Sequence, residues 1–286
     1  MTDGPATRFL NVNGIRLAYT EWPGRAGAPP LICLPHLTGH KGSFASLAAR
    51  LAPDYRVFAL DLRGRGESDR PEDGYGFAYH ARDILAFADG LGLLGFTLVG
   101  HSFGATAGVY LASIQPRRVH AIVLMDGGAD PSLETLRAMY ATIHQLSQHY
   151  ANPQAYLAAM RAIPFYQPWS RTLEQYFGDD VRRLSDGTVC ALASAAAVER
   201  DLDLHFDYCM CLHFPALRCP VLFLRPELGL RGDRGHVFSE PEVRAIINNI
   251  PRCTRVDVPG VNHYTMLLHD DPPVVPAIRE FLDQHP

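Results

Sequence analysis

The chain has 286 residues, of which 47% are hydrophobic and 20% charged, and its formal net charge at pH 7 is -4. This apolar fraction is typical of a globular protein and excludes a disordered one. A slightly acidic chain without a basic stripe is not expected to bind nucleic acid. No apolar run is long enough to span a membrane, and the first residues carry no secretory signal, so we expect a cytoplasmic protein without a membrane partner.

The first predicted element is a β-hairpin. Apolar and polar residues alternate around Asn13-Gly14, a dipeptide that is typical of tight hairpin turns. Short apolar runs without alternation follow, and they indicate strands that are buried on both faces of a parallel sheet. These runs are residues 31–34, 56–60, 96–99, 119–125, 221–224 and 254–258. Helical patterns lie between them, at residues 44–51, 79–91, 105–113, 241–250 and 272–284. This order predicts an α/β fold with a mostly parallel central sheet flanked by helices.

One segment, residues 129–215, interrupts the alternation of strands and helices. Apolar residues recur in it at helical spacing, and it shows no clear strand. The helical stretches are residues 132–150, 153–163, 170–184 and 189–202. The dipeptide Asp186-Gly187 is predicted as a boundary between two of these helices. We therefore expect a core made of residues 1–128 and 216–286 and a helical insertion made of residues 129–215.

The sharpest chemical signal is Gly100-His101-Ser102-Phe103-Gly104, which lies between a predicted strand and a predicted helix. A nucleophile on a tight strand-to-helix turn needs small neighbours, and the two glycines supply them. Ser102 would then project beyond the sheet edge at a helix N-terminus, where developing negative charge is stabilised. Its general base must come from a loop after a late strand. His263, directly after the last predicted strand, fits that position.

With these motifs the chain resembles the α/β-hydrolase family over nearly its whole length. Asp61-Leu62-Arg63-Gly64-Arg65-Gly66-Glu67-Ser68 matches the family's loop after the fourth strand. The resemblance implies that residues 129–215 form a cap over the active site and that the backbone N–H groups of Leu37 and Phe103 form an oxyanion hole. It implies neither a cofactor nor a metal. Where the family typically has His-Gly, this chain has Pro35-His36, so His36 is a substrate contact, a helper in proton transfer or a tolerated substitution.

Three carboxylates are candidates for the catalytic acid that would orient His263. In most of the family it follows the seventh strand, and Glu227 and Asp233 lie near that point. In a subset of the family it follows the sixth strand, where this chain has Asp126. We favour Asp126 because it ends a strand beside small residues that allow close approach. The subset includes amide, lactone and C–C bond hydrolases.

The predicted function is hydrolysis of a carboxylic ester or lactone of a small to medium apolar or aromatic substrate, through an acyl-enzyme on Ser102. Phe165, Tyr166 and Trp169, all in the predicted cap, are candidate substrate contacts together with His36. Several alternatives stay open, because a fold does not fix a function. They are an amide or C–C bond hydrolase, a perhydrolase, a lyase, a cofactor-free oxygenase and a ligand receptor. An apolar cap would also allow a homodimer.

The six cysteines form no CxxC pair, and without a secretory signal they are expected to be reduced and mostly buried. They are Cys33, Cys190, Cys209, Cys211, Cys219 and Cys253. On one helix, His205, Cys209 and His213 would share a face and offer a metal three ligands. Structural zinc normally takes four ligands at stricter spacing, so we interpret the group as core thiols and surface histidines. His40 and His80 are expected on the surface or in the cap.

Overall fold

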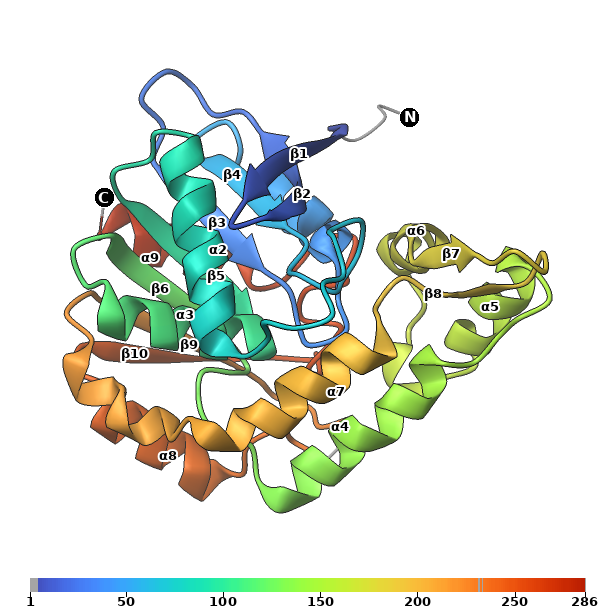
Figure 1. Cartoon of the computed structure of the whole chain (residues 1–286). Helices are drawn as coiled ribbons and strands as arrows, with labels where there is room; N and C mark the ends of the chain where they lie inside the picture. The colour runs from blue at the N-terminus through green and yellow to red at the C-terminus, as the bar shows by residue number, and fades with distance from the viewer. Residues whose placement is uncertain (1–4, 231, 233, 286) are drawn as a thin grey trace.

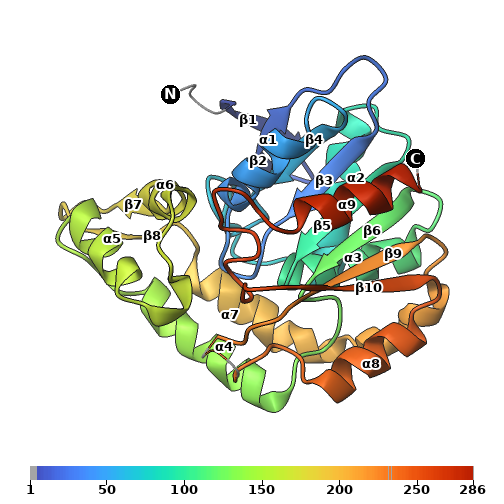
Figure 2. The same ribbon diagram turned by 180° about the vertical axis from the view of Figure 1, so that it is seen from behind.

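The computed structural model of the chain describes residues 5–230, 232 and 234–285. It confirms the α/β fold, whose centre is an eight-stranded sheet (Figures 1 and 2). The strands are β1 (Thr7–Val12), β2 (Ile15–Trp22), β3 (Pro30–Leu34), β4 (Arg56–Leu60), β5 (Phe96–His101), β6 (Val119–Met125), β9 (Val221–Pro226) and β10 (Cys253–Val258). Their order in the sheet is β1-β2-β4-β3-β5-β6-β9-β10. β2 pairs antiparallel with β1 and β4, and the other pairs are parallel.

The predicted hairpin is β1–β2. Asn13 and Gly14 join its strands with φ angles of 47° and 79°. Both angles lie in the left-handed region that a two-residue hairpin turn requires, and asparagine and glycine reach that region at the lowest cost.

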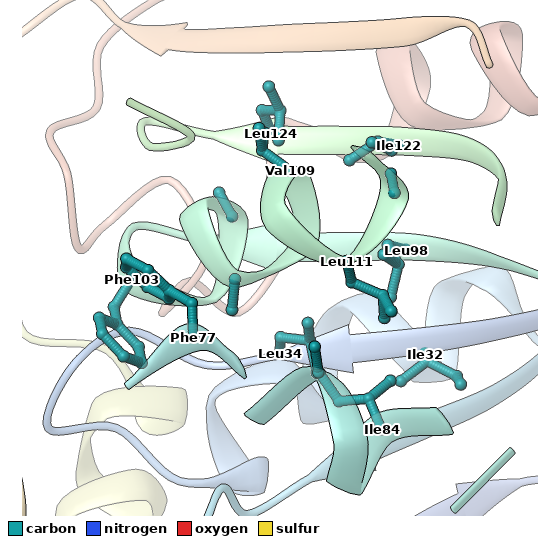
Figure 3. Close-up of a cluster of buried hydrophobic side chains, with 14 of the residues drawn as sticks. Ile32, Leu34, Phe77, Ile84, Leu98, Phe103, Val109, Leu111, Ile122 and Leu124 are labelled. Carbon is teal, nitrogen blue, oxygen red and sulfur yellow. The ribbon is translucent and has the colours of Figure 1, made fainter. Parts of the chain in front are cut away.

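The inner strands that pair in parallel, from β4 to β9 in the sheet order, bury both of their faces. The expectation of a fully buried strand is wrong for β10 at the sheet edge, where Val258 is the buried residue. In β3, Ile32 and Leu34 pack in one hydrophobic cluster, while Leu31 and Cys33 pack in another on the opposite face. Three helices cover the first face: α2 (Phe77–Gly90), α3 (Phe103–Ile114) and α8 (Glu240–Asn249). Two cover the second: α1 (Ala45–Leu51) and α9 (Val275–Asp283). Figure 3 shows the first cluster, in which side chains of α2 and α3 lie against those of β3 and β5.

The inserted segment (residues 129–215) connects β6 to β9. Its helices are α4 (Leu133–Leu146), α5 (Pro153–Arg161), α6 (Arg171–Asp179) and α7 (Ala195–Asp203). α4 and α7 lie side by side (Figure 1). The hydroxyl of Tyr140 donates to Asp203 across them at 2.6 Å. α5 and α6 lie in a separate lobe (Figure 2). Its hydrophobic cluster is rich in aromatic residues and also includes Leu268 of the core. The division of the chain into a core and a cap domain stays a prediction.

The expectation that the inserted segment lacks strands is wrong. β7 (Val181–Arg183) and β8 (Val189–Ala191) pair antiparallel where the ends of two helices were predicted. Asp186 and Gly187 form the turn between them: Gly187 has a φ of 86°, and Asp186 Oδ1 accepts from the N–H of Thr188 at 2.9 Å. Strands of three residues are too short to show a period of two, so only the turn chemistry marks this hairpin in the sequence.

Residues 205–213 do not form one helix, and the interpretation of this group as core thiols and surface histidines is also wrong. Two separate 3₁₀ turns, Leu204–Asp207 and Met210–Leu212, occupy the segment. Cys209 and Cys211 are exposed, while His205 is 5% exposed. Among the residues that the structure describes, no group of three or more histidine, cysteine or carboxylate side chains could hold a metal ion.

His40 and His80 are buried rather than exposed. Nε2 of His80 lies 3.0 Å from Asp201 Oδ2, and Nε2 of His40 lies 3.1 Å from the carbonyl oxygen of Tyr176. A histidine with a polar partner can be buried at little cost, and such a partner is invisible to local sequence patterns. Within the described ranges, no helix has both the length and the apolarity to cross a membrane.

Candidate functional site

Ser102 occupies a strained turn between β5 and α3. Its φ and ψ are 53° and -116°, a conformation that residues other than glycine rarely adopt. The two glycines of the motif make the turn possible, because a Cβ at Gly100 would overlap the backbone of Ala105 and a Cβ at Gly104 would overlap the carbonyl oxygen of Leu34. Ser102 is partly exposed, and the turn presents its side chain at the end of the sheet.

Asp126 and His263 are brought together from distant parts of the chain. The register of β5 and β6 pairs His101 with Met125, so Ser102 and Asp126 follow the ends of neighbouring strands. His263 follows β10, and its Nδ1 lies 2.6 Å from Asp126 Oδ2, with both residues buried. An ionised carboxylate only accepts hydrogen bonds, so Nδ1 carries the proton and Nε2 is left as the basic nitrogen.

Glu227, one of the other two candidate acids, has a different partner. Its Oε2 accepts from the backbone N–H of Gly260 at 2.7 Å and so holds the loop that leads from β10 to His263. Asp233 lies outside the residues that the structure describes. Of the described candidates, Asp126 is therefore the carboxylate that contacts the imidazole of His263.

His101, inside the nucleophile motif, is a residue that the sequence analysis missed. Its Nε2 lies 2.8 Å from the carbonyl oxygen of His263, so Nε2 donates to it, and the two imidazole rings are 4.6 Å apart. Burial lowers the pKa of His101 well below its usual value, and the nearby His263 lowers it further. His101 is therefore a neutral side chain that holds the His263 loop. Its position directly before Ser102 was the one sequence feature that could have marked it as part of the site.

The two residues predicted for the oxyanion hole lie at neighbouring strand ends. Phe103 is the first residue of α3, and the first N–H groups of a helix have no partner within it. Leu37 follows β3, whose Leu34 pairs with Gly100 of β5. The carbonyl oxygen of Leu37 accepts from Arg65 Nε at 2.9 Å. This bond holds the peptide group that follows Leu37.

Arg65 belongs to a buried ionic network that sequence analysis did not predict. Its Nη1 lies 2.5 Å from Asp201 Oδ2 in α7, and neither side chain is exposed. Asp201 also accepts from the backbone N–H of Gly76 at 2.6 Å and contacts His80. Burial opposes ionisation of Asp201, but His80 and Arg65 outweigh it and hold the pKa of this carboxyl below its usual range. The network joins the inserted segment to the Leu37 loop.

His36 also connects the core to the inserted segment. Its Nε2 lies 3.2 Å from the hydroxyl of Tyr176 in α6, and the ring of His40 stacks on Tyr176 at 4.3 Å. Burial, followed by the neighbouring His263 and His40, lowers the pKa of His36 to about 3. A neutral, buried His36 fits a structural role of this residue in place of the usual glycine.

Ser102 lines a pocket of about 20 Å³ whose other walls are mostly apolar. The lining residues are Ser102, Phe103, Thr106, Asp126, Gly127, Ala129, Pro131, Met139, His205, Val237 and Phe238. Met139, His205 and Phe238 come from three segments that only tertiary packing brings together, so no local pattern could have marked them. His205 supplies an imidazole to this lining, and its Nε2 lies 3.5 Å from Asp130 Oδ1.

None of the four predicted substrate contacts lines this pocket. The rings of Phe165 and Tyr166 each lie 5.1 Å from that of Tyr264, next to His263. Trp169 stacks on Phe177 at 5.7 Å and donates its Nε1–H to Glu174. These aromatic side chains pack the α5–α6 lobe, and Phe165 and Tyr166 also dock it on the His263 loop.

Comparisons with known proteins identify the family of the chain. A model of the alpha/beta hydrolase fold family matches residues 29–270. A 2-(acetamidomethylene)succinate hydrolase of Mesorhizobium japonicum is 29% identical over 97% of this chain and 95% of its own length. An N-formylmaleamate deformylase of Pseudomonas putida is 36% identical, but over 41% of this chain and 43% of its own length. A crystal structure of E-2-(acetamidomethylene)succinate hydrolase superposes with a TM-score of 0.85, at 25% identity and with 97% of this chain and 99% of that chain covered. The chain therefore belongs to the alpha/beta hydrolase fold family and is a hydrolase of that fold.

Proposed function

We propose that this hydrolase cleaves a small amide through an acyl-enzyme on Ser102, with His263 as general base and Asp126 as the acid that orients it. The observation that carries the proposal is the 2.6 Å contact between His263 Nδ1 and Asp126 Oδ2, next to a serine held in a strained strand-to-helix turn. That contact fixes the tautomer in which Nε2 can accept a proton.

The reaction has two steps. Ser102 Oγ attacks the carbonyl carbon while His263 Nε2 takes the hydroxyl proton, and the N–H groups of Leu37 and Phe103 stabilise the oxyanion. His263 then gives this proton to the leaving nitrogen, and the C–N bond breaks. Water, deprotonated by His263, attacks the acyl-enzyme and releases the acid and free Ser102.

The choice of an amide rests on the relatives. One relative that matches along nearly the full length is named for hydrolysis of 2-(acetamidomethylene)succinate, and one partial match is a deformylase named for N-formylmaleamate. Both named compounds carry an acyl group on nitrogen. The acyl groups in both names, acetyl and formyl, are short, so we propose a short acyl group for the substrate of this chain. An ester or lactone is the second candidate, because the same residues form the same acyl-enzyme from it.

A fluorophosphonate tests the nucleophile. The intact mass of the native protein should rise by one adduct, while Ser102→Ala should stay unmodified with an unchanged circular dichroism spectrum. Ser113→Ala is the matched control, because this serine lies in α3, the helix that begins directly after Ser102, and its hydroxyl donates to the carbonyl oxygen of Tyr110. An adduct that persists in Ser102→Ala would show that another residue is the nucleophile.

Matched substrates test the bond type. Two pairs share an acyl group and differ in the leaving atom: p-nitroacetanilide against p-nitrophenyl acetate, and the corresponding formyl compounds. 2-(Acetamidomethylene)succinate and N-formylmaleamate complete the panel. We expect turnover of at least one amide, lost in Ser102→Ala. Turnover of the esters with no cleavage of any amide would replace the amide by an ester as the proposed substrate.

A further inference from the structure

Two exposed cysteines lie side by side at the point where the inserted segment returns to the core. Sγ of Cys209 and Sγ of Cys211 are 3.0 Å apart, at the turn Met210–Leu212 that follows α7. A disulfide bond is about 2.05 Å long, so a movement of about 1 Å would bring the two sulfur atoms to bonding distance. The contact with Cys209 raises the pKa of Cys211, as expected when one S–H points at the other sulfur.

The turn is held in a way that keeps both sulfur atoms on its outer side. Met210, between the two cysteines, is fully buried, and its N–H donates to Asp130 Oδ2 at 2.9 Å. The N–H of Leu212 donates to the carbonyl oxygen of Cys209 at 3.0 Å. The backbone conformation that juxtaposes the thiols is therefore fixed before any reaction, which lowers the entropy cost of joining them.

The other four cysteines are poor reactants. Cys33, Cys190 and Cys219 are buried, and Cys253 is half-buried. Burial raises the pKa of Cys219 to about 11 and that of Cys253 to about 12, and it raises the pKa of Cys33 still further. Burial or partial burial shields all four thiols from reagents in solution, whereas Cys209 and Cys211 are exposed. Reagents that attack thiols should meet Cys209 and Cys211 first.

We propose that Cys209 and Cys211 form a reversible dithiol–disulfide site that is oxidised by a small-molecule disulfide. The thiolate of one cysteine attacks a sulfur of the oxidant and forms a mixed disulfide, and one thiol of the oxidant leaves. The second cysteine, as its thiolate, attacks the protein sulfur of that mixed disulfide, and the other thiol of the oxidant leaves. The protein loses two hydrogen atoms, and the oxidant is reduced to two thiols. Because the resulting bond is exposed and closes a very short loop, a dithiol reductant should reverse it readily.

Peptide mapping tests this proposal independently of the enzyme's substrate. Trypsin cleaves after Arg200 and Arg218, and the peptide between them contains Cys209 and Cys211 as its two cysteines. The native protein is treated with oxidised glutathione, alkylated with iodoacetamide and digested without reductant. We expect this peptide to lose the mass of two hydrogen atoms and to carry no alkyl group. Dithiothreitol added before alkylation should restore two alkyl groups.

Two variants sharpen the test. Cys211→Ser should stop at the mixed disulfide and gain one glutathione, because the second thiol is missing. Cys253→Ser is the matched control and should close as the native chain does. The proposal is overturned if the native peptide is fully alkylated under conditions that oxidise free dithiothreitol. It is also overturned if the peptide retains two glutathiones or links to a second chain.

Discussion

Nε2 of His101 lies 2.8 Å from the carbonyl oxygen of His263, so the residue before the proposed nucleophile holds the residue proposed as its base. Two further contacts hold the same loop, one from the end of β9 and one within the loop itself. Glu227 accepts from Gly260, and Asn262 Oδ1 accepts from the N–H of Thr265 at 3.0 Å. The loop of His263 is thus held by residues at the ends of β5 and β9, and Asp126 after β6 contacts its imidazole. The inserted segment adds the bond from Asn262 Nδ2 to the carbonyl oxygen of Phe165.

Asp126→Asn should lower kcat by about 10⁴-fold without unfolding the protein, because an amide can no longer fix the imidazole tautomer. The backbone should tolerate the change, since Asp126 has a φ of 46° and asparagine adopts this region readily. Steady-state kinetics on one activated substrate and a thermal melt measure both effects.

Glu227→Gln and Asp233→Asn are the controls for that prediction. Glutamine keeps an acceptor for the N–H of Gly260, so Glu227→Gln should retain near-native kcat. A loss of several orders of magnitude in either control, with Asp126→Asn active, would assign the acid to the loop after β9 instead.

Sequence patterns predicted the core well because its inner strands bury both faces. Residues 56–60 and 119–125, for example, coincide with β4 and β6. Ser102 was predictable because it lies in a turn motif with a structural requirement. Position 104 needs a glycine because the backbone of α3 lies against the end of β3 there and leaves no room for a Cβ. Arg65 and Asp201 are 136 residues apart in the sequence, and no local pattern around either residue predicts their contact. The walls of the Ser102 pocket were missed for the same reason.

Gly104→Ala should destabilise the protein by about 1–3 kcal/mol, because the added methyl group overlaps a backbone carbonyl oxygen that cannot move aside. The obstructed atom is the carbonyl oxygen of Leu34, close to the predicted oxyanion hole, so kcat should fall as well. Gly178→Ala is the matched control. Gly178 lies in α6 with open space around its Cα, and alanine there should stabilise the helix by about 0.5–1 kcal/mol. Urea unfolding measures both, and equal effects would contradict the prediction.

Tyr176→Phe should destabilise the fold by about 1–3 kcal/mol, because it leaves Nε2 of buried His36 without its hydroxyl partner. Stacking with His40 is unaffected by the change, so the loss reports the hydrogen bond. Tyr150→Phe provides the comparison. Its hydroxyl donates to Gln148 Oε1 at the surface, and its loss should change the free energy of unfolding by less than about 0.5 kcal/mol. Similar values for the two variants would show that the contact between His36 and Tyr176 contributes nothing.

The lowered pKa of His36 should appear in the pH dependence of the free energy of unfolding. Its pKa of about 3 in the folded protein lies below the usual value of 6.5, so between these values the unfolded chain binds a proton that the native state does not. This contribution is fully present above about pH 6.5 and is lost as the pH falls towards about 3, at about 1.4 kcal/mol per pH unit. His36→Asn should reduce the slope of unfolding free energy against pH by that amount between pH 4 and 6. Urea titrations at several pH values measure it, and an unchanged slope would mean that His36 is protonated in the native state.

Asp201→Ala should lower the free energy of unfolding by about 3–5 kcal/mol, because it leaves the guanidinium of Arg65 buried without its counter-charge. Arg65 also donates to the carbonyl oxygen of Leu37, so a displaced guanidinium should disturb the predicted oxyanion hole and lower kcat more than it raises KM. Asp203→Ala separates this effect from general damage to α7. Asp203 lies two residues further along the helix, is exposed and accepts from the hydroxyl of Tyr140, so its loss should cost about 1 kcal/mol or less. If Asp201→Ala were destabilised as predicted but kept its kcat, the network would hold the inserted segment on the core without positioning Leu37.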